Sequence, residues 1–267
     1  MPAIELARLK TQAARLAEKS GDPQAFVHDL DELLDAYTNR TIRARQVVRR
    51  LAAPTYHTPR PVMRQIEYEL DLLVESQPAQ AAGLVGVLWE AGSLESRLLA
   101  AYLLGSLPLA EARPALTHLT AWLAGTTDRQ IQAALLTTAL ARLRREDPAG
   151  FFAMLEGWLG SAQAIHQIWG MQALIPLLQD EHFENLPAVF HILRPAILAA
   201  VPATQLDLQA CLAALEAHSG VETASFLREI ITDHPQPSML RILRRILPAL
   251  SREMQDRLRG LLRERII

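Results

Sequence analysis

A short pattern of tryptophan, glycine and a hydroxyl residue recurs along this sequence, and an internal repeat constrains the fold more than any single motif does. It reads Trp89-Glu90-Ala91-Gly92-Ser93, then Trp122-Leu123-Ala124-Gly125-Thr126, then Trp158-Leu159-Gly160-Ser161. The copies follow one another at intervals of 33 and 36 residues, and each precedes a new helical stretch. We therefore expect one repeat to consist of two helices.

The residue types at this junction predict its structure. Glycine at the end of a helix adopts the left-handed conformation that terminates it, and a Ser or Thr that follows caps the next helix. The resulting turn is short, so the two helices should pack antiparallel. The Trp falls in the last turn of the first helix, where we expect its ring to pack in the core between neighbouring repeats.

The rest of the chain supports an all-helical fold. Leu, Ala, Arg, Glu and Gln dominate, only 5% of the residues are aromatic, and no segment has the pattern of a strand. The sequence predicts an all-α, HEAT-like α-solenoid of stacked antiparallel helix pairs, with about fifteen helices. We expect one domain over residues 1–267, with N-terminal helices at 1–57, repeats at 58–250 and a capping helix at 251–267.

Cysteine content and hydropathy bear on the compartment. Cys211 is the single cysteine and lies in an apolar helical run, so we expect it in the core and expect no internal disulfide. The first residues lack the layout of a secretion signal, and every apolar run is shorter than the about 20 residues that span a membrane. We therefore expect a cytoplasmic protein.

Charge is segregated along the chain despite a net charge of -2. Residues 40–65 hold seven Arg and no acid, and residues 241–267 hold eight Arg and three acids. Residues 66–240 hold eight Arg and 19 acids. The two basic segments are candidates for phosphate contacts, or alternatively solvated helix faces that pair with acids on neighbouring repeats.

Several side chains stand near the starts of successive second helices, which line the concave surface of a solenoid. They are Arg97, Arg129 and His166, with Trp169 one turn further on. We consider them candidates for a shared inner face, together with Asp128; solvated charge with a buried Trp is the alternative. Candidate DNA-binding residues are Arg43, Arg45, Arg49, Arg60, Arg64, Arg97 and Arg129.

Motifs of the common enzyme classes are absent. The sequence contains no phosphate-binding glycine motif, no Gly-x-Ser-x-Gly elbow, no His-Glu-x-x-His and no calcium loop. The eight His residues have no metal-ligand spacing. We therefore predict no cofactor, no metal and no catalytic residue.

From about residue 58 to 230 the order of landmarks resembles the HEAT-like repeat DNA alkylation repair family, the bacterial alkylpurine DNA glycosylases. Pro61-Val62-Met63-Arg64 is similar to that family's Pro-x-x-Arg start of a repeat helix. Leu88-Trp89 followed by Glu95-Ser96-Arg97-Leu98-Leu99-Ala100 is similar to its Leu-Trp and Glu-x-Arg-x-x-Ala pair. The resemblance implies a helical-repeat fold and a DNA partner.

The resemblance also identifies where this chain departs from the family. Active members carry Trp-Trp-Asp-x-x-Asp, whose Trp and last Asp recognise and hydrolyse the cationic lesion nucleotide. Here the matching stretch is Thr126-Thr127-Asp128-Arg129-Gln130-Ile131, with Ile131 in place of the catalytic Asp, and a later lesion-contacting Trp falls at about Ala213. Cleavage needs a carboxylate and an aromatic wall for the cation, so we expect glycosylase activity to be absent.

Three functions remain open at this point. The first is a non-catalytic DNA binder that contacts the phosphate backbone without reading bases. The second is a protein-interaction scaffold that holds a partner in the concave groove, for which the acidic middle suits a basic partner. The third is an active glycosylase with an unconventional site built from Asp128, Trp122 and Trp169.

Overall fold

The computed structural model describes residues 5–38 and 53–264 of the chain. That part is built from α-helices and two short 3-10 helices and contains no strand, which confirms the all-α class. The chain divides into two compact units, Met1–Glu146 and Asp147–Ile267, here called the first and second unit. A solenoid that runs through both units stays a prediction.

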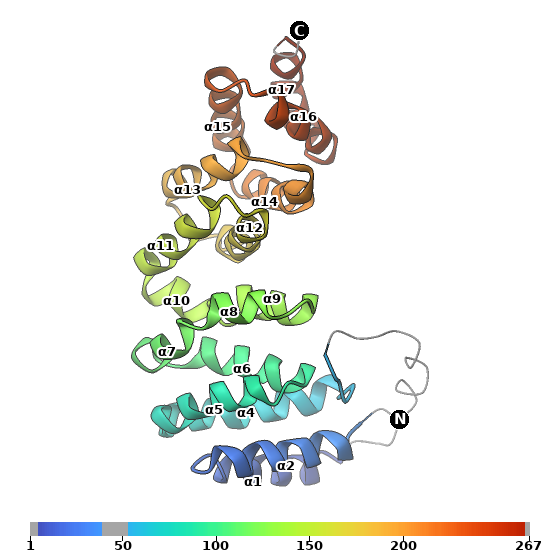
Figure 1. The fold of residues 1–267 in the computed structure, drawn as a ribbon, viewed down its shortest axis with the longest axis vertical. Coiled ribbons are helices and arrows are strands. Elements are labelled where there is room, and N and C mark those ends of the chain that lie inside the picture. Colours follow the sequence, from blue (N-terminus) through green and yellow to red (C-terminus); the bar gives the residue numbers. More distant parts are fainter. Residues whose placement is uncertain (1–4, 39–52, 265–267) are drawn as a thin grey trace. The chain divides into compact units, whose positions relative to one another are not determined.

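Helices of the first unit stack in layers (Figure 1), and the contacts between them divide the helices into two columns. One column contains α1, α4, α6 and α9, and the other contains α2, α5 and α7 with the short α10. Their bounds are α1 Leu6–Glu18, α2 Pro23–Ala36, α4 Arg60–Ser76, α5 Pro78–Glu90, α6 Leu94–Ser106, α7 Leu109–Leu116, α8 Leu119–Ala124, α9 Arg129–Thr137 and α10 Ala141–Glu146.

The second unit repeats this pattern of alternate contacts. Helices α12, α14 and α16 form one column, and α11, α13 and α15 form the other, with α17 packed on α15. Their bounds are α11 Pro148–Leu159, α12 Ala164–Leu178, α13 Leu186–Leu198, α14 Gln205–His218, α15 Gly220–Asp233, α16 Pro237–Ile246 and α17 Arg252–Glu264, with 3-10 turns at Pro202–Thr204 and Leu247–Ala249.

The repeated turn behaves as predicted in its first copy only. Gly92 has a φ of 80°, and the Ser93 hydroxyl accepts a hydrogen bond from the backbone of Ser96 at 3.1 Å, so it caps α6. The predicted left-handed glycine is wrong at Gly125 and Gly160, whose φ values are -82° and -79°. Each of these two turns is one residue longer than the first, so the chain reverses there without a positive φ.

A close approach of two backbones fixes how α6 and α9 pack. A Cβ placed on Gly105, near the end of α6, would collide with the carbonyl group of Thr138, just beyond the end of α9. Arg142 also donates a hydrogen bond to the Ser106 carbonyl oxygen at 2.5 Å. The C-terminal ends of α6 and α9 are therefore neighbours, and the two helices run parallel.

The end of the chain has the one-sided pattern predicted for a capping helix. In α17, Met254, Leu258 and Leu262 are buried, whereas Arg252, Asp256 and Arg259 are exposed. Among the helices of the described part, none has both the length and the apolarity that a membrane crossing requires.

Candidate nucleic-acid interface

The first unit gathers four arginines at one edge. Because α4, α6 and α9 are neighbours in one column and alternate with antiparallel partners, their N-terminal ends lie on the same side. Arg60 is the first residue of α4 with Arg64 one turn on, Arg97 lies in the first turn of α6, and Arg129 is the first residue of α9. We call this group the N-terminal edge.

An aromatic stack joins two repeats at this edge. The rings of Trp89 and Trp122 lie nearly parallel, with centroids 4.6 Å apart and an angle of 16° between their planes. The His118 ring lies 6.2 Å from the Trp122 ring, and the Arg97 guanidinium carbon lies 4.9 Å from the Trp89 centroid. The cation–π contact holds the Arg97 head group in a fixed place at the end of the stack.

The repeated Trp residues were predicted to lie in the core, and their burial differs between the three copies. Trp158 and also Trp169 are buried, at 6% and 2% exposure. Trp89 and Trp122 are only half-buried, and their rings stack on each other between adjacent repeats. Sequence reasoning missed this stack, although the shared repeat position of the two Trp residues was a usable signal.

The arginines at the edge lack carboxylate partners. Within residues 5–38 and 53–264, none of Arg60, Arg64, Arg97 and Arg129 forms an ion pair with an acid. Arg60, Arg64 and Arg129 are exposed, and Arg97 is half-buried with its Nε donating to the Trp89 carbonyl at 3.4 Å. Their charges are therefore open to an external anion, and Glu67, further along α4, partly offsets those of Arg60 and Arg64.

Two of these arginines, Arg60 and Arg129, lie at helix N-termini, where the helix dipole disfavours a positive charge. Arg60 and Arg129 occupy the first position of α4 and α9, and neither helix has an acid in its first turn. The N-terminus carries the positive end of the helix dipole, so a cation there costs a few tenths of a kcal/mol up to about 1 kcal/mol. An anion bound at this edge would interact favourably with the guanidinium groups and with the dipole of α4, which has no side-chain cap, whereas the Asp128 carboxylate already caps α9.

Glu95, the one acid in the first turn of α6, directs its carboxylate to hydrogen bonds within the protein. It is buried, and its Oε1 accepts hydrogen bonds from the Thr55 hydroxyl at 2.9 Å and from the backbone of Tyr56 and Thr58 at 3.1 and 3.2 Å. Leu94 also donates to the Pro54 carbonyl oxygen at 2.7 Å. Glu95 thus fastens residues 54–58 across the start of α6.

Acids further along α4 limit the extent of the basic surface. Burial raises the pKa of Glu67, Asp71 raises it further, and the nearby Arg60 and Arg64 oppose this rise. Asp71 accepts a hydrogen bond from the Tyr102 hydroxyl at 2.6 Å, and burial together with this bond raises the pKa of Tyr102. The positive surface is therefore confined to the first two turns of α4.

The residues at the position where catalytic chemistry was considered, Asp128 and Ile131, take part in helix capping and in the core. Asp128 is the N-cap of α9, and its Oδ1 accepts hydrogen bonds from the backbone of Gln130 and Ile131 at 2.8 and 3.3 Å. Ile131, at the place of the family's catalytic Asp, is fully buried. The Asp128 carboxylate is thus occupied with capping the helix that carries Arg129.

His166 and Trp169 belong to the second unit and form a group of their own. Their rings lie 5.0 Å apart, and the His166 Nδ1 is 3.0 Å from the Ser161 hydroxyl. Trp169 is buried against Trp158, and its indole N–H has no hydrogen-bond partner among the described residues. The candidates Arg43, Arg45 and Arg49 lie outside the described residues.

The second basic segment places several exposed arginines on the last two helices of the second unit. Arg244 is engaged there, because its Nε and Nη2 donate to the Leu262 carbonyl oxygen at 3.1 and 2.7 Å near the end of α17. Other arginines remain exposed without a carboxylate partner among the described residues; these are Arg241, Arg245, Arg252, Arg259 and Arg263.

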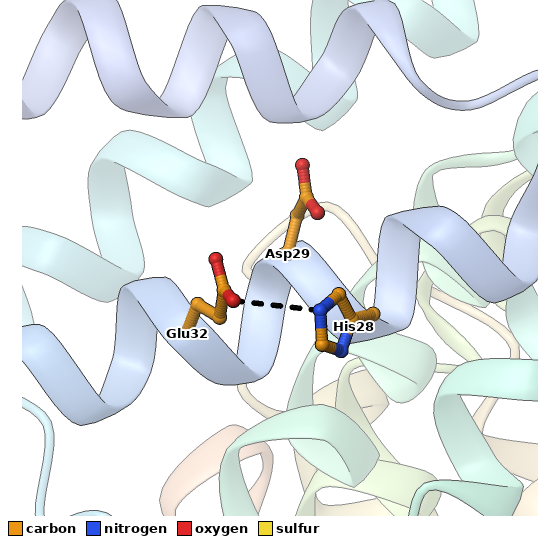
Figure 2. Close-up of side chains that lie close together, drawn as sticks. All are labelled: His28, Asp29 and Glu32. Carbon is orange, nitrogen blue, oxygen red and sulfur yellow. Dashed lines mark ion pairs between the residues drawn. The ribbon is translucent and has the colours of Figure 1, made fainter.

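One cluster of metal-ligand types occurs on α2, which sequence reasoning did not single out. The ligand atoms of His28, Asp29 and Glu32 lie within 4.8 Å of one another. His28 and Glu32 form an ion pair at 3.4 Å (Figure 2), and Asp29, which lies between them on the helix, forms an ion pair with Lys19. All three come from one helix and the outer two are largely exposed, so the cluster is that of a solvated helix face.

Comparison with known proteins gives no assignment: the chain matches no protein-family model and no curated protein.

Proposed function

We propose that this chain is a non-catalytic DNA-binding protein that contacts the phosphate backbone through the N-terminal edge of its first unit. The observation that carries the proposal is the convergence of Arg60, Arg64, Arg97 and Arg129 on the side where three helices begin. Phosphate groups are favoured by guanidinium groups and by helix N-termini alike.

The geometry favours backbone contacts over base recognition. The Trp89 and Trp122 rings stack on each other, and Arg97 lies over the Trp89 ring, so the face that each Trp turns to the other is not available for stacking with a base. Guanidinium groups at the edge reach phosphates without entering a groove. We therefore expect affinity that depends on salt and little on base sequence.

Two further observations support DNA as the anion. The motifs around Arg64, Trp89 and Arg97 resemble the HEAT-like DNA alkylation repair glycosylases, and the exposed arginines of α16 and α17 offer a second set of phosphate contacts. The absence of catalysis is part of the proposal, since Asp128 caps α9 and Ile131 is buried.

The proposal is tested by fluorescence anisotropy of a labelled duplex of about two helical turns at low salt. Each phosphate contact adds to the electrostatic affinity, so the double variant Arg97→Gln/Arg129→Gln should bind about tenfold more weakly or worse. Arg15→Gln is the matched control, because Arg15 is also exposed but lies in the last turn of α1, away from the edge. Equal losses in both variants would contradict an interface at the edge.

A further inference from the structure

The second unit contains an open hollow of about 500 Å³ between the end of α14 and the starts of α15 and α17. Its floor and walls are mostly small or apolar and include Ala213, Ala217, Gly220, Val221 and Met254. Small residues on the floor leave space that large apolar side chains of a partner can fill.

The hollow continues along the outer face of α14. Leu206 is 75% exposed, and Ala210, Ala213 and Ala217 follow it on the same face of the helix at spacings of four, three and four residues. Val221, at the start of α15, is 61% exposed and continues the apolar surface. The surface from residue 206 to 217 is roughly 16 Å long, about three helical turns.

Charges around this groove have one predominant sign. Helices α12 and α14 contain no Lys or Arg, whereas α14 carries Asp207 and Glu216. Glu216 is held in place at the start of α17, because its oxygens accept hydrogen bonds from the backbone and hydroxyl of Ser251 at 3.1 and 2.5 Å. Two arginines of α17 lie in or beside the wall: Arg257 forms an ion pair with Glu253 at 2.6 Å, and Arg252 is exposed next to the lining residues Ser251 and Glu253. The acids Asp207, Glu216 and Glu253 still outnumber the lining cation.

We propose that this groove binds a basic amphipathic helix of a partner protein. Apolar anchors of the partner, one per turn, fit along Leu206, Ala213 and Ala217, and Lys or Arg side chains beside them face Asp207 and Glu216. This is the helix-in-groove mode of recognition, in which anchors supply affinity and flanking charges set orientation. The groove is distinct from the N-terminal edge, which lies in the first unit.

A display selection on the full-length chain tests the proposal. A library of helical peptides of about five turns with varied charge is selected on the wild-type protein and counter-selected on Ala213→Arg/Ala217→Arg. Both substitutions fall on the surface of α14 and block the groove with bulk and positive charge. Ala149→Arg, at an exposed position of α11, is the matched control for added surface charge.

We expect enriched peptides to be basic and amphipathic, and to bind the double variant about tenfold more weakly, or worse, than the wild type or Ala149→Arg. Glu216→Gln should weaken binding several-fold and reduce its salt dependence. Enrichment of acidic or neutral peptides, equal binding to the double variant, or no enrichment would overturn the proposal. Arg97→Gln/Arg129→Gln, in the first unit, should leave peptide binding unchanged, so the two proposals can fail separately.

Discussion

Glycine-to-alanine substitution should have opposite effects at two positions of the first unit. At Gly83, inside α5, an added Cβ has no neighbour within 4 Å. Alanine there reduces the conformational freedom of the unfolded chain without a clash. We expect Gly83→Ala to raise the free energy of unfolding by about 0.5–1 kcal/mol.

At Gly105 the same change forces two helices apart. The new Cβ would lie inside contact distance of the Thr138 carbonyl oxygen, 2.9 Å from the carbonyl carbon and 3.3 Å from the Ala139 Cα. These are backbone atoms, so relief requires α6 to move away from α9. Such overpacking costs about 1–3 kcal/mol, and the helix preference of alanine offsets at most about 1 kcal/mol. We expect a net loss of about 1–2 kcal/mol.

Urea unfolding followed by far-ultraviolet circular dichroism measures both effects. Because the chain has two units, a second signal specific to the first unit is needed. The stacked rings of Trp89 and Trp122, both in the first unit, provide this second signal, because two coupled indoles give an exciton band in circular dichroism. If Gly105→Ala is as stable as the wild type or more stable, the close approach of α6 and α9 and the alignment of Arg97 with Arg129 are both wrong.

Three further substitutions or probes test single side chains. Glu95→Ala leaves three hydrogen-bond donors of residues 55–58 without their acceptor, so it should lower the free energy of unfolding by about 2–4 kcal/mol in urea titrations. The control is Glu90→Ala at an exposed position, which should change the free energy of unfolding by about zero. Burial raises the pKa of Glu67, so its ionised form is disfavoured in the folded state and its effect on stability worsens as pH rises through that pKa. Glu67→Gln should therefore stabilise the protein at neutral pH and lose this advantage below about pH 4, under the ordinary pKa of a Glu; a constant difference across that range would contradict the assignment. Burial raises the pKa of the Cys211 thiol to about 12, so the reactive thiolate is scarce in the folded protein. A disulfide reagent at mildly alkaline pH should therefore label Cys211 only after denaturation. Rapid labelling of the native protein would contradict the burial of Cys211.

The all-α class was accessible from the sequence because its signals are local. The repeat interval, the helix-favouring composition and the Gly92-Ser93 turn each depend on a few neighbouring residues. The left-handed glycine failed at Gly125 and Gly160 because turn length, which a single extra residue changes, decides whether a positive φ is needed. The all-α fold class was therefore easier to predict from the sequence than the backbone conformation of the turns.

The candidate sites depend on contacts between repeats, which the sequence encodes only indirectly. Arg97 and Arg129 were identified from their places at helix starts, but the stack of Trp89 on Trp122 needs the spacing of two layers. The close approach at Gly105 depends on that same spacing. The groove beside Ala213 forms only because α17 returns to pack on α15, an arrangement that no local pattern predicts.

The most direct test of the central claim is the salt dependence of DNA affinity in the wild type and in Arg60→Gln/Arg64→Gln/Arg97→Gln/Arg129→Gln. Each lost phosphate contact reduces the slope of log affinity against log salt by about 0.9 for duplex DNA. If the four arginines contact phosphates, the slope should be shallower in the variant by about 3 to 4, with an unchanged circular dichroism spectrum. A wild type that does not bind DNA at low salt, or a variant with the wild-type slope, would contradict it.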